Sequence, residues 1–402
     1  MSDTQLPLQG LKVLDLSRIL AGPFCCQILG DLGANVVKVE RPGTGDDTRG
    51  WGPPFVEPEG PSAYYLSCNR SKRSLALDLS APAGRAVLHD LIRWADVLLE
   101  NFLPDSAARL GLSPADLQQL NPQLVSCSIS GYGRTGPMSQ VPGYDLVIQA
   151  ASGLMAITGE PEGRPMKVGV AICDVITGLY AAISVLSGLH ARRQATDETP
   201  AWAFDLSLLD CSLASLVNVA QGALLTGNRP RRFGNAHPHI VPYESFATSD
   251  GHLVLAIGND RQFAHFAAAV DQPAWSADPR FSTNSARVQH RDELIPLLQT
   301  LFSQRSTSTW RELLTAHDIP HGPVHTLDEL FSHPQTSARQ MLAQPADEPY
   351  PLLGSPIHWH AEPPRTPAAP PTLGQHTDEI LLHELHYTPT QLSQLRSSGV
   401  LG

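Results

Sequence analysis

A single aspartate stands in a long apolar stretch of this sequence. Residues 168–189 (VGVAICDVITGLYAAISVLSGL) hold one charged side chain, that of Asp174. A carboxylate is costly to bury without a partner. The small and apolar residues around it predict a helix that begins just before Asp174, where free N–H groups and the helix dipole favour an anion. We therefore expect Asp174 to stay charged in an apolar pocket, as a carboxylate nucleophile must.

Two other interpretations of this stretch are open. Asp174 could simply cap the N-terminus of the helix. The stretch is also long enough to cross a membrane, although Asp174 and the scattered serine, threonine and glycine residues count against a membrane span. The capping aspartate is therefore the main alternative to the nucleophile.

Basic and polar residues gather next to the ends of predicted strands in the first half of the chain. In an open α/β sheet, ligands bind at the carboxyl ends of the strands. Several cations in one such place would suit a ligand with more than one phosphate, although each of them alone is typical of a solvated surface. These residues are Arg41, Asn69, Arg70, Lys72, Arg73, Asn101, Arg109 and Tyr132.

The first half of the chain alternates strands with helices, which predicts an α/β fold with a mostly parallel sheet and helices on both faces. Strands are expected over 11–16, 35–40, 74–79, 96–101, 124–130 and the start of 201–210. Helices are expected over 21–32, 80–94, a short segment after Ser113, 144–157, the Asp174 stretch, and a segment that ends near Gly227.

A smaller second domain is expected over 228–330, where the sequence pattern changes. Residues 245–258 predict a hairpin that turns at Asp250-Gly251, and helices are expected over 260–270, 291–304 and 307–317. Residues 343–373 are rich in proline and predict an extended crossing segment, which two short helices follow.

Composition narrows the class of protein. The chain has 402 residues, a net charge of −11 and no block rich in lysine or arginine, so nucleic acid and an anionic membrane are not expected as partners. Six cysteines form no CxxC pair, which is typical of free thiols in a reducing cytosol. The polar N-terminus lacks a signal peptide, and we expect a cytoplasmic protein.

Three familiar chemistries find little support. The loop after the first strand reads Ser-Arg-Ile-Leu-Ala-Gly-Pro rather than GxGxxG, which argues against NAD even though Glu40 ends the second strand. His237 and His239, and His317 and His321, lack the further ligands of a zinc site, so no metal is expected. Ser130 and Asp145 could belong to a hydrolase triad, but GxSxG is absent.

The chain resembles the class III CoA-transferases, the family of formyl-CoA transferase and carnitine CoA-transferase. The resemblance implies that Asp174 is the nucleophile. It also implies a Rossmann-like large domain built from 1–227 and 331–402, a smaller α+β domain over 228–330, and an interlocked homodimer. Five segments in the family's order and spacing carry it: 20–46, 69–79, 100–111, 128–137 (SISGYGRTGP) and 167–181 (KVGVAICDVITGLYA).

The resemblance further implies that coenzyme A or an acyl-CoA is the substrate and that no cofactor is tightly bound. One lysine of the formyl-CoA transferase pattern falls on Pro142. To the family's CoA contacts we add Asn69, Arg73 and Tyr132 from the polar cluster. The family's own contacts fall on Ala21, Arg41, Lys72, Asn101, Phe102, Arg109 and Tyr144.

Residues 237–263 are similar to the branch of the family that uses succinyl-CoA and C5 dicarboxylates such as glutarate or itaconate. A distal carboxylate needs a cation, and Arg49, Arg232 and His237 are the candidates; the loop at Gly258-Asn259 could close over the site. An α-methylacyl-CoA racemase, whose pattern has a histidine where Tyr144 stands, and a non-catalytic acyl-CoA-binding protein are the alternatives.

Overall fold

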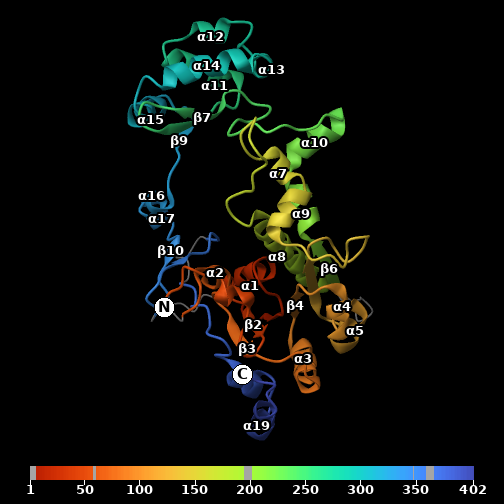
Figure 1. Cartoon of the computed structure of the whole chain (residues 1–402). Coiled ribbons are helices and arrows are strands. Elements are labelled where there is room, and N and C mark those ends of the chain that lie inside the picture. The colour runs from red at the N-terminus through yellow and green to blue at the C-terminus, as the bar shows by residue number, and fades with distance from the viewer. Residues whose placement is uncertain (1–5, 58–59, 194–201, 347, 359–365) are drawn as a thin grey trace. The chain divides into compact units, whose positions relative to one another are not determined.

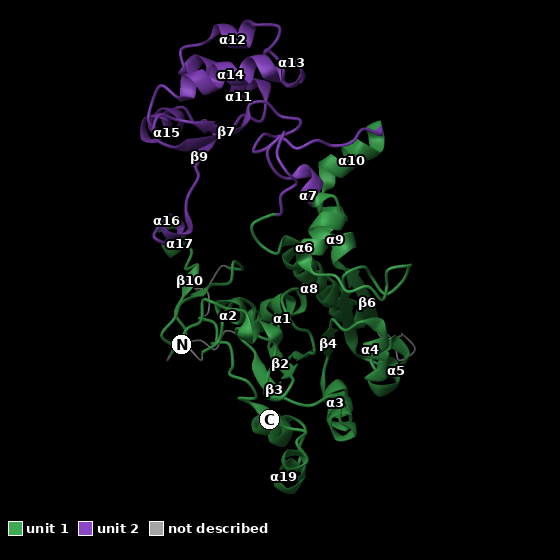
Figure 2. Ribbon diagram, viewed as in Figure 1, with its two compact units in different colours: residues 1–154, 168–226, 334–402 green, residues 155–167, 227–333 purple. Residues whose placement is uncertain are grey.

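The computed structural model describes residues 6–57, 60–193, 202–346, 348–358 and 366–402 of the chain (Figure 1). They divide into two compact units (Figure 2). Unit 1 comprises 1–154, 168–226 and 334–402, and unit 2 comprises 155–167 and 227–333. Residues 155–167, which we expected in the large domain, therefore belong with the smaller unit.

A six-stranded parallel sheet is the centre of unit 1. Its order is β3-β2-β1-β4-β5-β6, the order of a Rossmann-type sheet. Val13 and Leu14 of β1 are both fully buried and face opposite sides, as a sheet covered on both faces requires. The strands are β1 (Lys12–Asp15), β2 (Asn35–Glu40), β3 (Arg73–Ala76), β4 (Val97–Glu100), β5 (Val125–Ser130) and β6 (Trp202–Ser207).

Helices cover both faces of this sheet, as the alternating pattern predicts. One core joins the sheet to α3 (Pro82–Trp94) and the C-terminal segment, and the other joins it to α1 (Ala21–Asp31) and α8 (Ile172–Arg192). The remaining elements of the first half are η1 (Asp47–Gly50), α2 (Ala63–Cys68), α4 (Pro104–Arg109), α5 (Pro114–Leu120), α6 (Asp145–Ala151), α7 (Leu154–Ile157), α9 (Leu208–Ser215) and α10 (Val217–Thr226).

Helix α8 has the length and hydropathy of a membrane span, but its glycines fit it closely to its neighbours. A Cβ on Gly178 would lie 2.7 Å from the carbonyl oxygen of Ala21, and one on Gly188 would lie 2.8 Å from the Val125 side chain. Side chains would force these backbones apart. One face of α8 therefore packs against α1 and the sheet inside unit 1.

Unit 2 is built around an antiparallel sheet, β7 (Tyr243–Ala247), β8 (His252–Ala256) and β9 (His321–Pro323). The hairpin of β7 and β8 turns at Asp250-Gly251, where the sequence predicts it. Phenylalanine side chains and Trp310 fill the core between sheet and helices. The helices are α11 (Asp260–Ala269), α12 (Ala274–Ala277), α13 (Asn284–Gln289), α14 (Arg291–Phe302), α15 (Thr307–Ala316) and α16 (Leu327–Phe331).

The C-terminal segment completes unit 1. Leu401 forms a β-bridge with Leu77, and the N–H of His376 donates to the Ser74 carbonyl at 2.9 Å. Residues 359–365 of the proline-rich segment lie outside the described residues. The elements here are α17 (Pro334–Ala338), β10 (Leu342–Ala343), β11 (Leu352–Leu353), α18 (Thr377–Glu379), η2 (Ile380–Glu384) and α19 (Pro389–Ser397).

Candidate active site

Asp174 lies in the first turn of α8 and is partly buried. The helix begins after Ala171, which offers no side chain as a cap. Throughout the described parts of the chain, no residue makes a hydrogen bond or an ion pair with the Asp174 carboxylate. Asp174 is therefore not the capping residue of α8, and its oxygens are free to meet a ligand.

A different aspartate caps the start of α8. Asp145, the first residue of α6, accepts a 2.8 Å hydrogen bond from the Cys173 N–H and a 2.6 Å bond from the Gln149 amide. The buried Gln149 in turn accepts from the Val168 N–H at 2.8 Å. Asp145 and Gln149 thus fix the loop that leads into α8, and with it the position of Asp174.

The electrostatics of Asp174 differ from our expectation. Burial, with a further contribution from the Asp145 charge, raises the pKa of Asp174 to about 7. The expectation that the helix terminus keeps this carboxylate fully charged is wrong, because Asp145 takes the N–H of Cys173 and adds a like charge nearby. A carboxylate with so few stabilising contacts is more basic, and therefore more nucleophilic, than a solvated one.

Asp174 opens into a cavity of about 240 Å³ in unit 1. Four of the predicted CoA contacts line it with Asp174: Ala21, Asn101, Phe102 and Tyr144. They come from the start of α1, the loop after β4 and the residue before α6, so the carboxyl ends of neighbouring strands and helix N-termini converge here. The other lining residues are Arg18, Ile19, Leu20, Leu103, Ser106, Ile129, Ser130, Gly131, Pro142, Gly143 and Leu208.

Two glycines in this wall touch backbone to backbone. A Cβ on Gly131 would lie 2.6 Å from the Cα of Gly143, and one on Gly143 would lie 2.7 Å from the Cα of Gly131. Only glycine permits this approach. The contact draws the loop after β5 to the residue before Tyr144 and so shapes the cavity beside Asp174.

A larger cavity of about 660 Å³ shares Arg18 and Phe102 with the first. Arg41 lines it and is exposed. Arg109 is also exposed, and its guanidinium donates to Ser106, a residue of the smaller cavity. Arg41 and Arg109 therefore remain candidates for phosphate contacts next to the Asp174 cavity.

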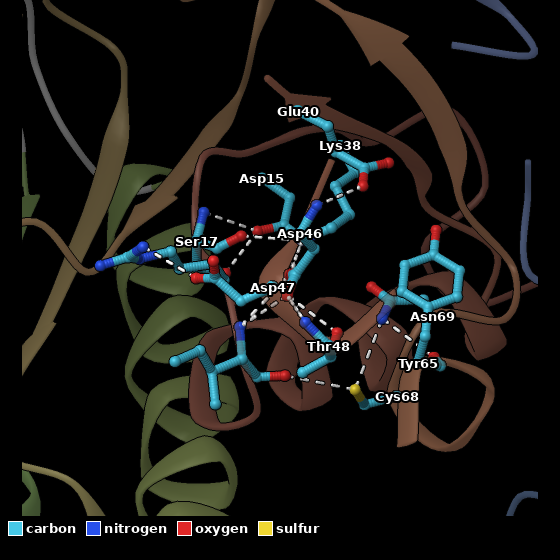
Figure 3. Close-up of polar contacts among 12 residues, drawn as sticks. Asp15, Ser17, Lys38, Glu40, Asp46, Asp47, Thr48, Tyr65, Cys68 and Asn69 are labelled. Atoms are coloured by element: carbon cyan, nitrogen blue, oxygen red, sulfur yellow. Dashed lines mark hydrogen bonds and ion pairs between the residues drawn. The ribbon is translucent and has the colours of Figure 1, made fainter. Parts of the chain in front are cut away.

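Lys72 and Asn69 do not line the two cavities beside Asp174. The Lys72 ammonium is fully buried and bonds the Asp15 carboxylate at 2.9 Å and the Asn69 amide oxygen at 3.0 Å. This network, part of which Figure 3 shows, continues through Ser17 to Lys38 and Asp46. The lysine neutralises a buried carboxylate of the sheet, which gives it a structural role in unit 1.

Arg73 and Tyr132 are also placed elsewhere. Arg73 begins β3, at the edge opposite the strand carboxyl ends, and pairs there with Glu384 at 2.7 Å and Glu379 at 2.9 Å. Tyr132 packs against the core between the sheet and α8. Neither lines the two cavities beside Asp174, and Arg73 instead lines a separate cavity of about 740 Å³; their contact with CoA stays a prediction.

Arg49 is held inside unit 1 and is not free for a substrate carboxylate. Its guanidinium bonds Glu40 through two 2.7 Å contacts and also donates to the Tyr65 hydroxyl and the Pro371 carbonyl. The Glu40 carboxylate in turn accepts from Ser74. The acid that ends β2 thus holds an arginine in place of the ribose of a dinucleotide.

The other predicted substrate residues lie in unit 2 and have structural partners there. Arg232 donates to three backbone carbonyls, those of Ala156, Glu160 and Gly163. Burial lowers the pKa of His237, with help from His239 and Arg291, which favours its neutral form. Asn259 caps α11, and the Gly258 N–H donates to Gln262. A substrate role for Arg232, His237, Gly258 and Asn259 stays a prediction.

Three residues of the site were missed from the sequence. Arg18 lies three residues after the end of β1, and that position alone could have marked it as a strand-end cation. Asp145 had been considered only for a triad. Tyr64 of α2 lies close enough to Asp174 for burial and the Asp174 charge to raise its pKa to about 12, so its phenol stays protonated near neutral pH.

The described residues do not form a cluster of metal ligands. Within the ranges that the structure describes, no group of three histidine, cysteine, aspartate or glutamate side chains could hold a metal ion. All six cysteines are buried free thiols, and burial raises the pKa of Cys173, next to Asp174, to about 11. The reactive group that the geometry offers is the Asp174 carboxylate.

The chain is similar to known proteins over nearly its whole length. The model of CoA-transferase family III matches residues 8–377. The succinate–glutarate CoA-transferase of Agrobacterium fabrum is 42% identical, over 95% of this chain and 96% of its own. The human succinyl-CoA:glutarate CoA-transferase is 41% identical, over 98% of this chain and 90% of its own.

A solved structure shares the fold. A CAIB/BAIF family protein from Brucella suis superposes with a TM-score of 0.83 at 41% identity, covering 94% of this chain and 100% of its own. The α/β architecture of unit 1 is therefore common to this chain and that protein.

Proposed function

The chain belongs to CoA-transferase family III, and on that premise we propose that it moves coenzyme A from succinyl-CoA to a C5 dicarboxylic acid, glutarate or itaconate. The observation that carries the proposal is the unpaired Asp174 carboxylate in a small cavity beside a larger one with exposed cations. The two CoA-transferases at about 40% identity, one named for succinate and glutarate and the other for succinyl-CoA and glutarate, support glutarate as the acceptor.

The reaction we propose starts at Asp174. Its carboxylate oxygen attacks the thioester carbonyl, the C–S bond breaks, and CoA leaves as a thiolate from the mixed anhydride. The thiolate then attacks the aspartyl carbonyl of that anhydride, which releases succinate and leaves an aspartyl-CoA thioester. The acceptor carboxylate displaces the thiolate to form a second anhydride, and attack of the thiolate on its acyl carbon frees Asp174.

Each step exchanges one activated acyl group for another, so the reaction needs neither ATP nor an added base. The barrier falls because the groups are held together and water is excluded. A raised pKa suits Asp174 as nucleophile, because the carboxylate is more basic yet ionised in a large share of molecules at pH 7.

Trapping the acyl-enzyme tests this mechanism. The protein is incubated with succinyl-CoA, then with hydroxylamine, and the modified peptide is identified by mass spectrometry. We expect the label on Asp174 in the native protein, none in Asp174→Asn, and a transfer rate at least about a thousandfold lower in that variant. A label on another residue, or retention of activity in Asp174→Asn, would contradict the mechanism; deuterium exchange at an acyl α-carbon without transfer would indicate a racemase instead.

We also propose that two copies of the chain associate. Helix α8 leaves an apolar stripe exposed in unit 1 opposite the sheet: Leu179, Tyr180 and Ile183 are 46%, 41% and 59% exposed. Leu224 and Leu225 of α10 are 80% and 78% exposed. Apolar faces of this kind mark protein interfaces, and a second copy of the chain is the partner we propose for them.

A further inference from the structure

The cavity beside Asp174 is lined by a basic side chain. Of the described residues that line it, only Arg18 carries a basic side chain. Arg18 also lines the larger cavity, where Arg41 lies and where Lys38 is buried in its pair with Asp46. Arg18 therefore stands between the proposed nucleophile and the space available for the rest of an acyl-CoA.

The backbone of Arg18 is firmly held. Its N–H donates to the Asn101 amide oxygen at 3.1 Å, and its carbonyl accepts from the Asn101 amide nitrogen at 2.8 Å. The next residue, Ile19, has a φ of 74°, which is strained for a β-branched side chain, and its N–H donates to Asp46. The fold thus accepts local strain to place the Arg18 side chain at the cavity.

The side chain of Arg18, by contrast, is weakly engaged. Among the residues that the structure describes, its one ionic contact joins Nη1 to the Asp47 carboxylate at 2.8 Å, with the two side chains 55% and 49% exposed. An exposed pair of this kind contributes little stability, and a guanidinium has five donors. Arg18 can therefore exchange Asp47 for another carboxylate at small cost.

We propose that Arg18 binds the distal carboxylate of the succinyl or acceptor group, and that Asp47 holds the guanidinium until a substrate replaces it. The inference rests on the proposed function, because it presumes a dicarboxylyl substrate. It gives Arg18 a specificity-determining role, whereas the guanidinium groups of Arg49 and Arg232 already have structural partners. Because Arg41 lies only in the larger cavity, it is the better match for a phosphate there.

The test compares thioesters that differ only in the distal carboxylate. Calorimetry in an Asp174→Asn background, which removes turnover, gives the Kd of succinyl-CoA, butyryl-CoA and free CoA with and without Arg18→Gln. We expect Arg18→Gln to weaken succinyl-CoA at least about tenfold, equivalent to about 1.4 kcal/mol, and to leave butyryl-CoA and CoA within about twofold. Arg93→Gln is the matched control, since Arg93 is also 55% exposed, pairs with Asp90 at 2.7 Å, and lines neither cavity.

The three ligands distinguish the possible roles of Arg18. Equal weakening of all three ligands would assign Arg18 to the CoA moiety, and no weakening would leave it a surface residue; either result overturns the inference. Arg18→Lys should recover part of the succinyl-CoA affinity, and Asp47→Asn should strengthen it by removing the competing carboxylate. Because binding is measured without transfer, a native protein that transfers nothing to glutarate or itaconate would refute the proposed function and leave this test intact.

Discussion

The Asp145 carboxylate accepts a 2.8 Å hydrogen bond from the backbone N–H of Cys173, the residue immediately before Asp174. One aspartate thus does the capping that allows the other to remain unbonded. The same proximity lets the charge of Asp145 add to burial in raising the pKa of Asp174 to about 7. Position and reactivity of the proposed nucleophile depend on one neighbouring side chain.

Replacing Asp145 by asparagine should shift the pH dependence of transfer. Asp174 must lose its proton to attack, so kcat/KM of the native protein should rise with pH through about 7. Without the Asp145 charge the pKa of Asp174 falls, and the rising limb should move to lower pH. The measurement is kcat/KM for succinyl-CoA between pH 5 and pH 9.

Asp145→Ala is the companion variant, because alanine removes the cap of the Cys173 N–H as well as the charge. It should shift the limb in the same direction and also destabilise the protein by about 1 kcal/mol. If the limb stays in place in both variants, the Asp145 charge has no influence on Asp174.

Asp174→Asn should stabilise the protein at neutral and alkaline pH. A carboxyl whose pKa is raised by folding stabilises the fold below its unfolded value of about 4 and loses that contribution as pH rises to about 7. We expect the variant to gain on the order of 2 kcal/mol at pH 8, less than the full linkage value because Asp174 is only partly buried.

Urea unfolding of the native protein and Asp174→Asn at pH 4.5 and pH 8 measures this difference. The gain should be small at the lower pH, where both side chains are neutral. An equal gain at both values would show that packing, and not the charge, separates the two proteins.

Substitution of Lys72 should lower the stability of the protein, whereas substitution of Arg41 should lower its affinity for CoA. Lys72→Met leaves the buried Asp15 without its partner, which should cost about 3–5 kcal/mol of stability. Arg41→Gln, at an exposed position, should leave stability within about 0.5 kcal/mol and weaken CoA binding, more at low salt than at high. If Lys72→Met weakened CoA and left stability unchanged, the placement of Lys72 would be wrong.

Ile183→Asp should weaken association of two chains. The side chain is 59% exposed on α8, and a carboxylate there would be buried unpaired in an apolar contact. We expect a stable dimer for the native protein and a monomer for the variant in sedimentation velocity at micromolar concentration. Leu297→Asp, at an exposed position on α14 of unit 2, is the control, and a native monomer would contradict the proposed assembly.

The sequence predicted the elements of the parallel sheet because hydrophobic periodicity is a local signal. The same periodicity did not reveal the breaks within helices. The helix expected over 144–157 divides into α6 and α7, with Gly153 at a φ of 88° between them. The segment expected to run on to Gly227 bends by 79° between α9 and α10, where Val217 has a φ of 32°.

The site was harder to predict because the sequence does not show how deeply a charged side chain is buried. Lys72 and Arg49 are cations of the kind that bind phosphates and carboxylates. Lys72 instead pairs with Asp15 of β1, 57 residues earlier in the sequence, and Arg49 pairs with Glu40 at the end of β2, and which charge a fold buries in this way is not a local property of the sequence. Asp174 was recognisable because the contrast between a charge and an apolar stretch is itself local.

The bridge between Leu77 and Leu401 joins the residue that follows β3 to the C-terminal segment. During synthesis, the contiguous segment 227–333 leaves the ribosome before Leu401 has been made. The smaller unit can therefore fold while the larger still waits for its final segment. Until the C-terminal segment is made, the sheet residues that it covers stay exposed. A stalled or truncated nascent chain would present this apolar surface to chaperones.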